Sequence, residues 1–163
     1  MCLSGEAPAR QWQSVEQSSL DTWFDRYALY ARPDLSISYY NKGQLDGFLL
    51  DVLIRDATDN HRSLDDVMRA MNEQFAKKHR FYHDTVDIEA TAEKIAGVNL
   101  TDFFARYVAG TDELPYAEIL AKAGLRMTLR DARGEAEYRV SEAPDVSDKQ
   151  RRIRDGILHG HTD

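Results

Sequence analysis

The sequence predicts a mainly α-helical protein, a bundle of about six helices with a short β segment at the carboxyl end. Two observations lead to this fold class. Between residues 18 and 124, apolar residues recur with the helical period, and serine, glycine and proline residues stand at the ends of these stretches. Residues 125–130 instead alternate between apolar and polar side chains, as a strand does.

The first helix is expected from Ser18 to Ala31. Ser18 or Ser19 can cap its amino end, and Pro33 ends it because a proline disfavours the helical conformation of the residue before it. The apolar side chains of this helix fall on one stripe: Leu20, Trp23, Phe24, Tyr27 and Tyr30.

The second helix is expected to begin near Ser38, a plausible amino-terminal cap. It ends at residues 58–61, where polar residues interrupt the pattern. Its apolar stripe is formed by Leu45, Phe48, Leu49, Val52 and Leu53. Ser63 and Asp66 form a variant capping box at the start of the third helix. The expected buried face of that helix is Leu64, Val67, Met68, Met71 and Phe75.

Three further helices are expected to follow. The fourth runs from Asp84 to Ala96, with Gly97 as its carboxyl cap. Asn99 or Thr101 caps the fifth, which ends at Gly110. The sixth opens at Pro115 in its favoured first position and closes at Gly124. The apolar residues of the fifth are Phe103, Phe104, Tyr107 and Val108.

The carboxyl end changes character. Leu125–Arg130 is expected to be a strand, residues 131–134 a turn, and Glu137–Val140 a returning strand. After Ser141 apolar residues are sparse, so a disordered tail is expected. The predicted organisation is a helical lobe over residues 1–124, a β segment over 125–140 and a tail over 141–163.

Composition excludes several classes of function. The 163 residues suit one domain, and the net charge of −7 makes nucleic acid a poor partner, because phosphate binding favours a basic surface. The single Cys2 excludes a disulfide within the chain and a cysteine metal cluster. No apolar run is long enough for a membrane span. His79 and His83 would share a helix face, but a solvated loop is expected there, and His159 and His161 fall in the expected tail.

Two adjacent tyrosines, Tyr39 and Tyr40, open the second helix. They can pack, with each hydroxyl bonded to a carbonyl. Alternatively, a tyrosine hydroxyl, which keeps its proton at neutral pH, can donate to an oxyanion near the positive end of the helix dipole. Gly43 inside the helix costs about 1 kcal/mol relative to alanine, which suggests close packing or a close approach there.

The motif Tyr40-Asn41-Lys42-Gly43 resembles the Tyr-x-Lys-Gly motif of gluzincin aminopeptidases, and the fuller pattern resembles the glycyl aminopeptidase family of zinc metallopeptidases. The resemblance covers about residues 10–127. Its matching pieces, in order, are residues 10–19, 21–23, 30–34, 36–43, 50–55, 63–69, 102–104, 107–116 and 123–125.

This resemblance implies a thermolysin-like carboxyl-terminal lobe and a reaction on peptides. In such enzymes a zinc ion, held by His-Glu-x-x-His and a later Glu, activates the attacking water. Tyr40 matches the tyrosine that donates to the tetrahedral oxyanion. Tyr39 is expected in the pocket wall or in packing, Gly43 is expected to contact substrate, and Lys42 is expected to be a solvated or structural charge.

The zinc motif is not found in these 163 residues. The resemblance therefore implies that zinc and an amino-terminal zinc-binding lobe belong to a longer enzyme, and that no metal binds to this chain and no peptidase activity arises from it alone. Residues 125–140 would then be the possible start of a PDZ-like module. The alternative is a stand-alone, non-catalytic helical module that binds a peptide or protein partner. The compartment is left open.

Overall fold

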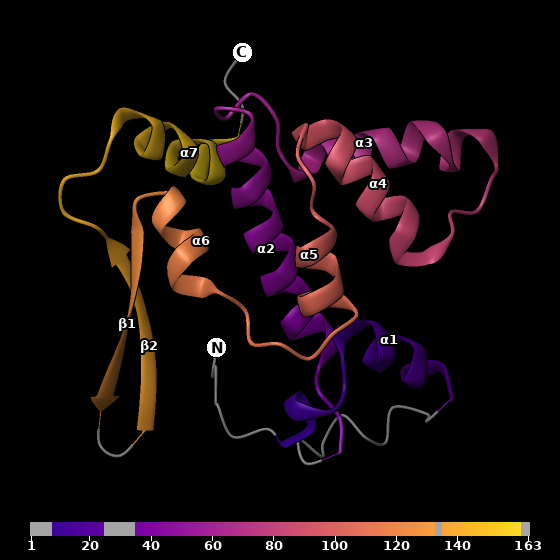
Figure 1. The fold of residues 1–163 in the computed structure, drawn as a ribbon, viewed down its shortest axis with the longest axis horizontal. Helices are drawn as coiled ribbons and strands as arrows, with labels where there is room; N and C mark the ends of the chain where they lie inside the picture. The colour runs from indigo at the N-terminus through magenta and orange to yellow at the C-terminus, as the bar shows by residue number, and fades with distance from the viewer. Residues whose placement is uncertain (1–7, 25–34, 133–134, 161–163) are drawn as a thin grey trace.

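The computed structural model describes residues 8–24, 35–132 and 135–160, and within these it shows seven α-helices and one two-stranded sheet (Figure 1). The predicted mainly α fold with a short β segment is thereby confirmed, while its thermolysin-like character stays a prediction. The elements in chain order are η1 Pro8–Gln11, α1 Val15–Phe24, α2 Tyr39–Ala57, α3 Leu64–Gln74, η3 Ala76–Lys78, α4 Asp84–Ala96, α5 Thr101–Phe103, η4 Phe104–Val108, α6 Tyr116–Lys122, β1 Leu125–Ala132, β2 Glu135–Glu142 and α7 Asp148–His159.

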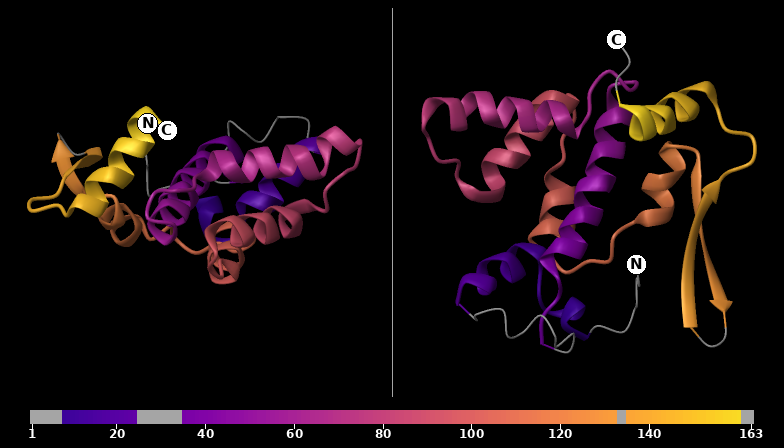
Figure 2. Two further views of the ribbon diagram at one scale, coloured as in Figure 1. Left: turned by 90° about the horizontal axis from the view of Figure 1, so that it is seen from above. Right: turned by 180° about the vertical axis from the view of Figure 1, so that it is seen from behind.

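Helix α2 is the centre of the structure. It contacts α1, α3, α4, η4, α6 and α7. In Figures 1 and 2, α3 and α4 lie to one side of α2, and α6, the hairpin and α7 lie to the other. Leu49, Val52 and Ile54 of α2 are fully buried, so the core forms around this helix. Neither α2 nor any other helix in the described ranges has the length and apolar character that crossing a membrane requires.

Helix α1 begins earlier than predicted, at Val15 rather than Ser18. The cap is Ser14, whose hydroxyl accepts a hydrogen bond from the Gln17 N–H at 3.0 Å. Ser18 instead lies inside the helix, where its buried hydroxyl donates to the Ile37 carbonyl at 2.6 Å. The expected cap at Ser18 or Ser19 is therefore wrong, because this serine bonds to a distant segment instead of to its own helix.

The apolar stripe of the first helix is not buried where it can be examined. Leu20 is 47% exposed and Trp23 is 87% exposed. The side of α1 that is buried carries Val15 and the polar Ser18, so hydrophobicity does not mark it. The side chain of Phe24, residues Tyr27 and Tyr30, and the expected helix end at Ala31 and Pro33 lie outside the described residues.

Helices α3 and α4 follow the predicted boundaries. The capping box is present at the start of α3, where the Ser63 N–H donates to Asp66 Oδ2 at 2.9 Å. Val67 is fully buried as expected, but Met68 is 51% exposed, which contradicts its predicted burial. Helix α4 ends at Gly97 with a φ of 69°, a left-handed conformation that favours glycine.

The fifth predicted helix is a short α-helical turn that continues into the π-helical turn η4. Leu100 takes the cap position of this helix, so the predicted cap at Asn99 or Thr101 is wrong. Asn99 Oδ1 instead accepts a hydrogen bond from the Thr101 N–H at 3.2 Å just before the helix. Phe103, Phe104 and Tyr107 are buried. The sixth helix is confirmed, although Pro115 takes the cap position and Tyr116 is the first helical residue.

The β segment is an antiparallel hairpin, longer than predicted at both strands. Its register pairs Met127 with Val140 and Leu129 with Tyr138. Leu129 and Val140 are 61% and 50% exposed, so the apolar side chains of the hairpin are only partly covered. The assignment of residues 125–140 to the start of a PDZ-like module stays a prediction.

The predicted disordered tail after Ser141 is wrong, because residues 148–159 form helix α7. A capping box starts this helix: the Ser147 N–H donates to Gln150 Oε1 at 2.8 Å, and Ser147 Oγ accepts from the Gln150 N–H at 3.2 Å. Ile153 is fully buried in the common core. Few apolar residues are needed here because one face of a short helix is enough to dock it.

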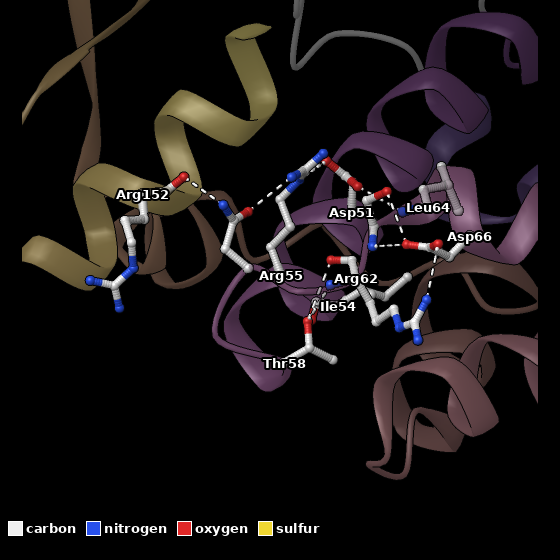
Figure 3. A network of polar contacts seen from close by, with 10 residues as sticks. Asp51, Ile54, Arg55, Thr58, Arg62, Leu64, Asp66 and Arg152 are labelled. Carbon is white, nitrogen blue, oxygen red and sulfur yellow. Dashed lines mark hydrogen bonds and ion pairs between the residues drawn. The ribbon is translucent and has the colours of Figure 1, made fainter. Parts of the chain in front are cut away.

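A polar network joins α7 and α3 to the end of α2 (Figure 3). The buried Arg55 donates from Nε to Asp51 Oδ2 at 2.7 Å and from Nη1 to Asn60 Oδ1 at 2.9 Å. Asn60 in turn donates to the Arg152 carbonyl of α7 at 2.9 Å, and Asp51 Oδ1 accepts from the Leu64 N–H of α3 at 2.8 Å. The guanidinium is thus buried with its partners, as a buried charge requires.

Candidate functional site

The candidate site lies at the first turns of α2, which the sequence positions through its cap. Ser38 Oγ accepts a hydrogen bond from the Asn41 N–H at 3.3 Å, as predicted, so Tyr39 and Tyr40 are the first helical residues. The segment that precedes α2 is held at Ile37 by hydrogen bonds to α1 and to the turn that precedes α1. The Ile37 N–H donates to Gln13 Oε1 at 2.9 Å, and the Ile37 carbonyl accepts from Ser18.

The two tyrosine rings stack against each other, with centroids 4.2 Å apart and an angle of 31° between the planes. Tyr40 is 63% exposed, while Tyr39 is half-buried. The two side chains therefore leave the same helical turn toward different surroundings.

A pocket of about 390 Å³ opens beside Tyr39. Its wall on α2 follows the helical spacing, with Tyr39, Gly43, Asp46, Gly47 and Leu50. Residues of α1, α3 and α4, together with the segment just before α4 and the turn of α5 and η4, complete the lining. The volume lies in the range of pockets that bind small ligands.

Of the three residues predicted for the site, Tyr39 and Gly43 line this pocket and Tyr40 does not. A Cβ added at Gly43 would lie 3.7 Å from Val15 Cγ2, an ordinary contact, so close packing does not force a glycine here. At Gly43 the pocket wall is formed by backbone, without a side chain.

Asp46 is the residue that the sequence reasoning missed. It lines the pocket, is only 5% exposed, and neither carboxyl oxygen has a hydrogen-bond partner among the described residues. Burial without a donor raises its pKa to about 7, against the opposing influence of Lys42 one turn earlier. The signal in the sequence is an acid at helical spacing between Gly43 and Leu50, on a face that is otherwise apolar.

Lys42 lies between several charges near this face of α2. Its pKa is lowered by burial, and the carboxyl group of Asp46 acts in the opposite direction. Lys42 still does not bring its ammonium within hydrogen-bond distance of either Asp46 oxygen. The pair is therefore close enough to interact through space, but the carboxyl group keeps its unsatisfied oxygens.

The described lining of the pocket contains three acids, Glu16, Asp46 and Asp84, and no lysine, arginine or histidine. Glu16 Oε1 accepts a hydrogen bond from Thr85 Oγ1 at 2.7 Å. The rim is open and carries three apolar residues beside the exposed Ser19 and Asp84: Leu20, Met68 and Tyr82 are 47%, 51% and 54% exposed. This combination favours an apolar ligand that carries positive charge.

The described residues do not make a zinc site. Nowhere in residues 8–24, 35–132 and 135–160 do three His, Cys, Asp or Glu side chains gather where they could hold a metal ion. His79 follows η3 in the left-handed region with a φ of 52°, and the exposed His83 precedes α4. The pair therefore flanks the loop that the sequence predicts. His161 lies outside the described residues.

Comparison with protein families agrees with the resemblance that the motifs suggest. The model of the M61 glycyl aminopeptidase family matches residues 4–45, a stretch that includes Tyr39, Tyr40 and Gly43 and ends one residue before Asp46. No curated protein and no solved structure matches the chain. Through residues 4–45, the chain is thus linked to the M61 glycyl aminopeptidases, the peptidase family that its motifs resemble.

Proposed function

We propose that this chain forms the helical lobe of the catalytic domain of a zinc aminopeptidase, which hydrolyses the amino-terminal bond of peptides. The observation that carries the proposal is the family match over residues 4–45, which covers the Tyr40–Gly43 motif at the first turn of α2. Tyr40 is the proposed transition-state donor, and Tyr39 and Gly43 are proposed to contact the substrate.

The chemistry requires a donor where negative charge develops. When water attacks a peptide carbonyl, the carbonyl oxygen becomes an oxyanion, and a hydrogen bond to it lowers the barrier. Tyr40 has a largely exposed side chain, and it lies at a helix start, where free N–H groups and the dipole also favour negative charge. These features support the proposed role of its hydroxyl.

Zinc in such enzymes supplies the activated water. Since the described residues do not gather a metal site, its ligands would come from elsewhere, and an amino-terminal zinc-binding lobe is the partner that we propose. The part of the reaction assigned to this chain is the hydrogen bond from Tyr40 and one wall of the substrate pocket.

The test is Tyr40→Phe in the full-length protein that contains this chain, with Tyr39→Phe as the matched control. Tyr40→Phe should lower kcat by roughly 100- to 1000-fold, the usual cost of one oxyanion donor, with zinc content and melting temperature unchanged. Tyr39→Phe should keep most of its turnover. A Tyr40→Phe enzyme with near wild-type kcat would remove Tyr40 from the mechanism.

A second candidate is a non-catalytic module that binds a peptide or protein partner. The exposed apolar rim of the pocket, at Leu20, Met68 and Tyr82, favours it, because such surfaces mark interaction sites. The two candidates differ in turnover. With zinc present, the full-length protein that contains this chain hydrolyses peptides if it is a peptidase. If the chain is a binding module, that protein binds peptides with an apolar residue but does not hydrolyse them.

A further inference from the structure

We propose that the pocket beside Tyr39 binds organic amines, with the ligand ammonium at the Asp46 carboxylate and an apolar group against the rim. The inference goes beyond the proposed reaction, because it concerns binding alone and requires no zinc. It rests on three features of the described residues: an unsatisfied buried acid, a lining without bases, and an apolar mouth.

The first feature is the Asp46 carboxyl group. A buried polar group normally has a hydrogen-bond partner, and leaving one without is costly. Asp46 is 5% exposed, and both of its oxygens lack partners, although it lies in the wall of a pocket. A ligand that brings N–H donors into this pocket would supply the hydrogen bonds that the Asp46 oxygens lack.

The second feature is the charge of the surroundings. The titratable groups near Asp46 are Lys42 on its own helix, Glu16 on α1, Tyr82 and Asp84 next to and in α4, and Tyr116 on α6. Lys42 is the cation in this set, and it does not contact the Asp46 oxygens. A ligand anion would meet three acids in the lining, whereas an ammonium would be attracted by all three.

The third feature selects the body of the ligand. Leu20, Met68 and Tyr82 form an exposed apolar part of the rim, and Gly43 and Gly47 leave two positions of the α2 wall without a side chain. A pocket of about 390 Å³ accommodates a phenyl or branched aliphatic group. The chemistry that fits is therefore an ammonium joined to an apolar group, which is found both in free amines and at the amino terminus of peptides.

Binding should be linked to the ionisation of Asp46. In the free protein, burial raises the pKa of this carboxyl group to about 7, so at lower pH it is mostly protonated and cannot pair with an ammonium. Since only the ionised fraction binds, the affinity for an amine that stays charged should rise about tenfold between pH 6 and pH 8. When the ammonium binds below pH 7, it pairs with the Asp46 carboxylate, and the carboxyl group releases its proton to solvent.

The experiment is isothermal titration calorimetry on the whole chain with phenethylamine, phenylalanyl-alanine amide and its N-acetyl derivative. Phenethylamine and the free dipeptide amide should bind, and acetylation should abolish binding because it removes the ammonium. If both bind, the pocket accepts free amines and peptide amino termini alike. Binding of the dipeptide amide alone assigns the pocket to peptide amino termini, and binding of phenethylamine alone assigns it to free amines. All three results support an amine site. Equal binding of the acetylated peptide, or no binding of either amine, overturns it.

The matched variants are Asp46→Asn and Asp65→Asn. Asp46→Asn keeps the shape of the side chain and should weaken binding by roughly 10- to 100-fold, the value of a charged hydrogen bond. Asp65 is exposed at the start of α3 and does not line the pocket, so Asp65→Asn should change affinity by less than about threefold. Circular dichroism and thermal melts establish that both variants fold, and the pH dependence of the wild type provides a test without any substitution.

Unchanged affinity in Asp46→Asn, or affinity independent of pH, overturns the proposal. Tyr40→Phe should not alter the affinity for amines, so the proposed role of Tyr40 in hydrolysis can fail without affecting the test of the amine site.

Discussion

Tyr39 and Tyr40 stack at the first turn of α2 with ring centroids 4.2 Å apart, yet Tyr39 lines the pocket and Tyr40 does not. Successive helical residues point about 100° apart, so one turn of helix can present one side chain to a pocket and the next to a different part of the surface. The roles that we propose for the two neighbours differ accordingly, ligand contact for Tyr39 and hydrogen-bond donation for Tyr40, so Tyr39→Phe is a suitable control for Tyr40→Phe.

The stability of the protein should depend on pH through Asp46. The pKa of this group is about 7 in the folded protein and near 3.8 when it is exposed, so the folded state binds the proton more tightly. Its contribution to stability is complete below pH 4 and is lost as the pH rises through about 7. Between about pH 5 and pH 8, the free energy of unfolding of the wild type should fall by about 2–3 kcal/mol relative to Asp46→Asn.

Urea denaturation of both proteins across this pH range measures the difference. Asp65→Asn is the control, because Asp65 is exposed at the start of α3 and should show little change relative to wild type. A difference between wild type and Asp46→Asn that stays constant with pH would mean that the Asp46 carboxyl group is solvated or paired in solution.

Helix α7 should contribute to the stability of the core. Ile153 is fully buried, so Ile153→Ala should lower the free energy of unfolding by about 2–5 kcal/mol through lost burial and a cavity. Leu158 on the same helix is 67% exposed, and Leu158→Ala should cost less than about 0.5 kcal/mol. Equal, small effects of the two substitutions would show that α7 does not dock in solution.

The polar network at the end of α2 should be a second point of attachment for α7. Arg55→Met leaves the Asp51 carboxylate and the Asn60 amide without their shared partner, and should cost about 3 kcal/mol, the usual penalty for breaking a buried pair. Arg62 also forms an ion pair, with Asp66, but is 57% exposed, so Arg62→Met should cost less than about 1 kcal/mol. Denaturant titrations measure the free energy of unfolding of both variants. A loss of less than about 1 kcal/mol in Arg55→Met would mean that the network contributes little to the docking of α7.

Local signals predict those parts of the fold whose contacts are local. The cap at Ser38, the capping box at Ser63 and the glycine at Gly97 each act within a few residues, and the helices that they bound appear where expected. The start of α1 could not be predicted in this way, because Ser18 is fixed by its hydrogen bond to Ile37, 19 residues away. The sequence contains no local sign of that contact.

Helix α7 was missed for a different reason. The Ser147–Gln150 capping box is readable in the sequence, but the low density of apolar residues after Ser141 suggested disorder. Ile153 suffices because the core against which it packs is built by earlier helices. The Tyr40 motif could be found from sequence alone, whereas the importance of Asp46 depends on a pocket that exists only once α1, α3 and α4 surround α2.

The most direct test of the proposed peptidase lobe is to read the gene in frame upstream of the Met1 codon. We expect a His-Glu-x-x-His motif there, followed some twenty residues later by a glutamate, which would place the zinc ligands on the proposed partner lobe. A stop codon just upstream, with no such motif, would contradict the proposal and leave the peptide-binding module as the function to pursue.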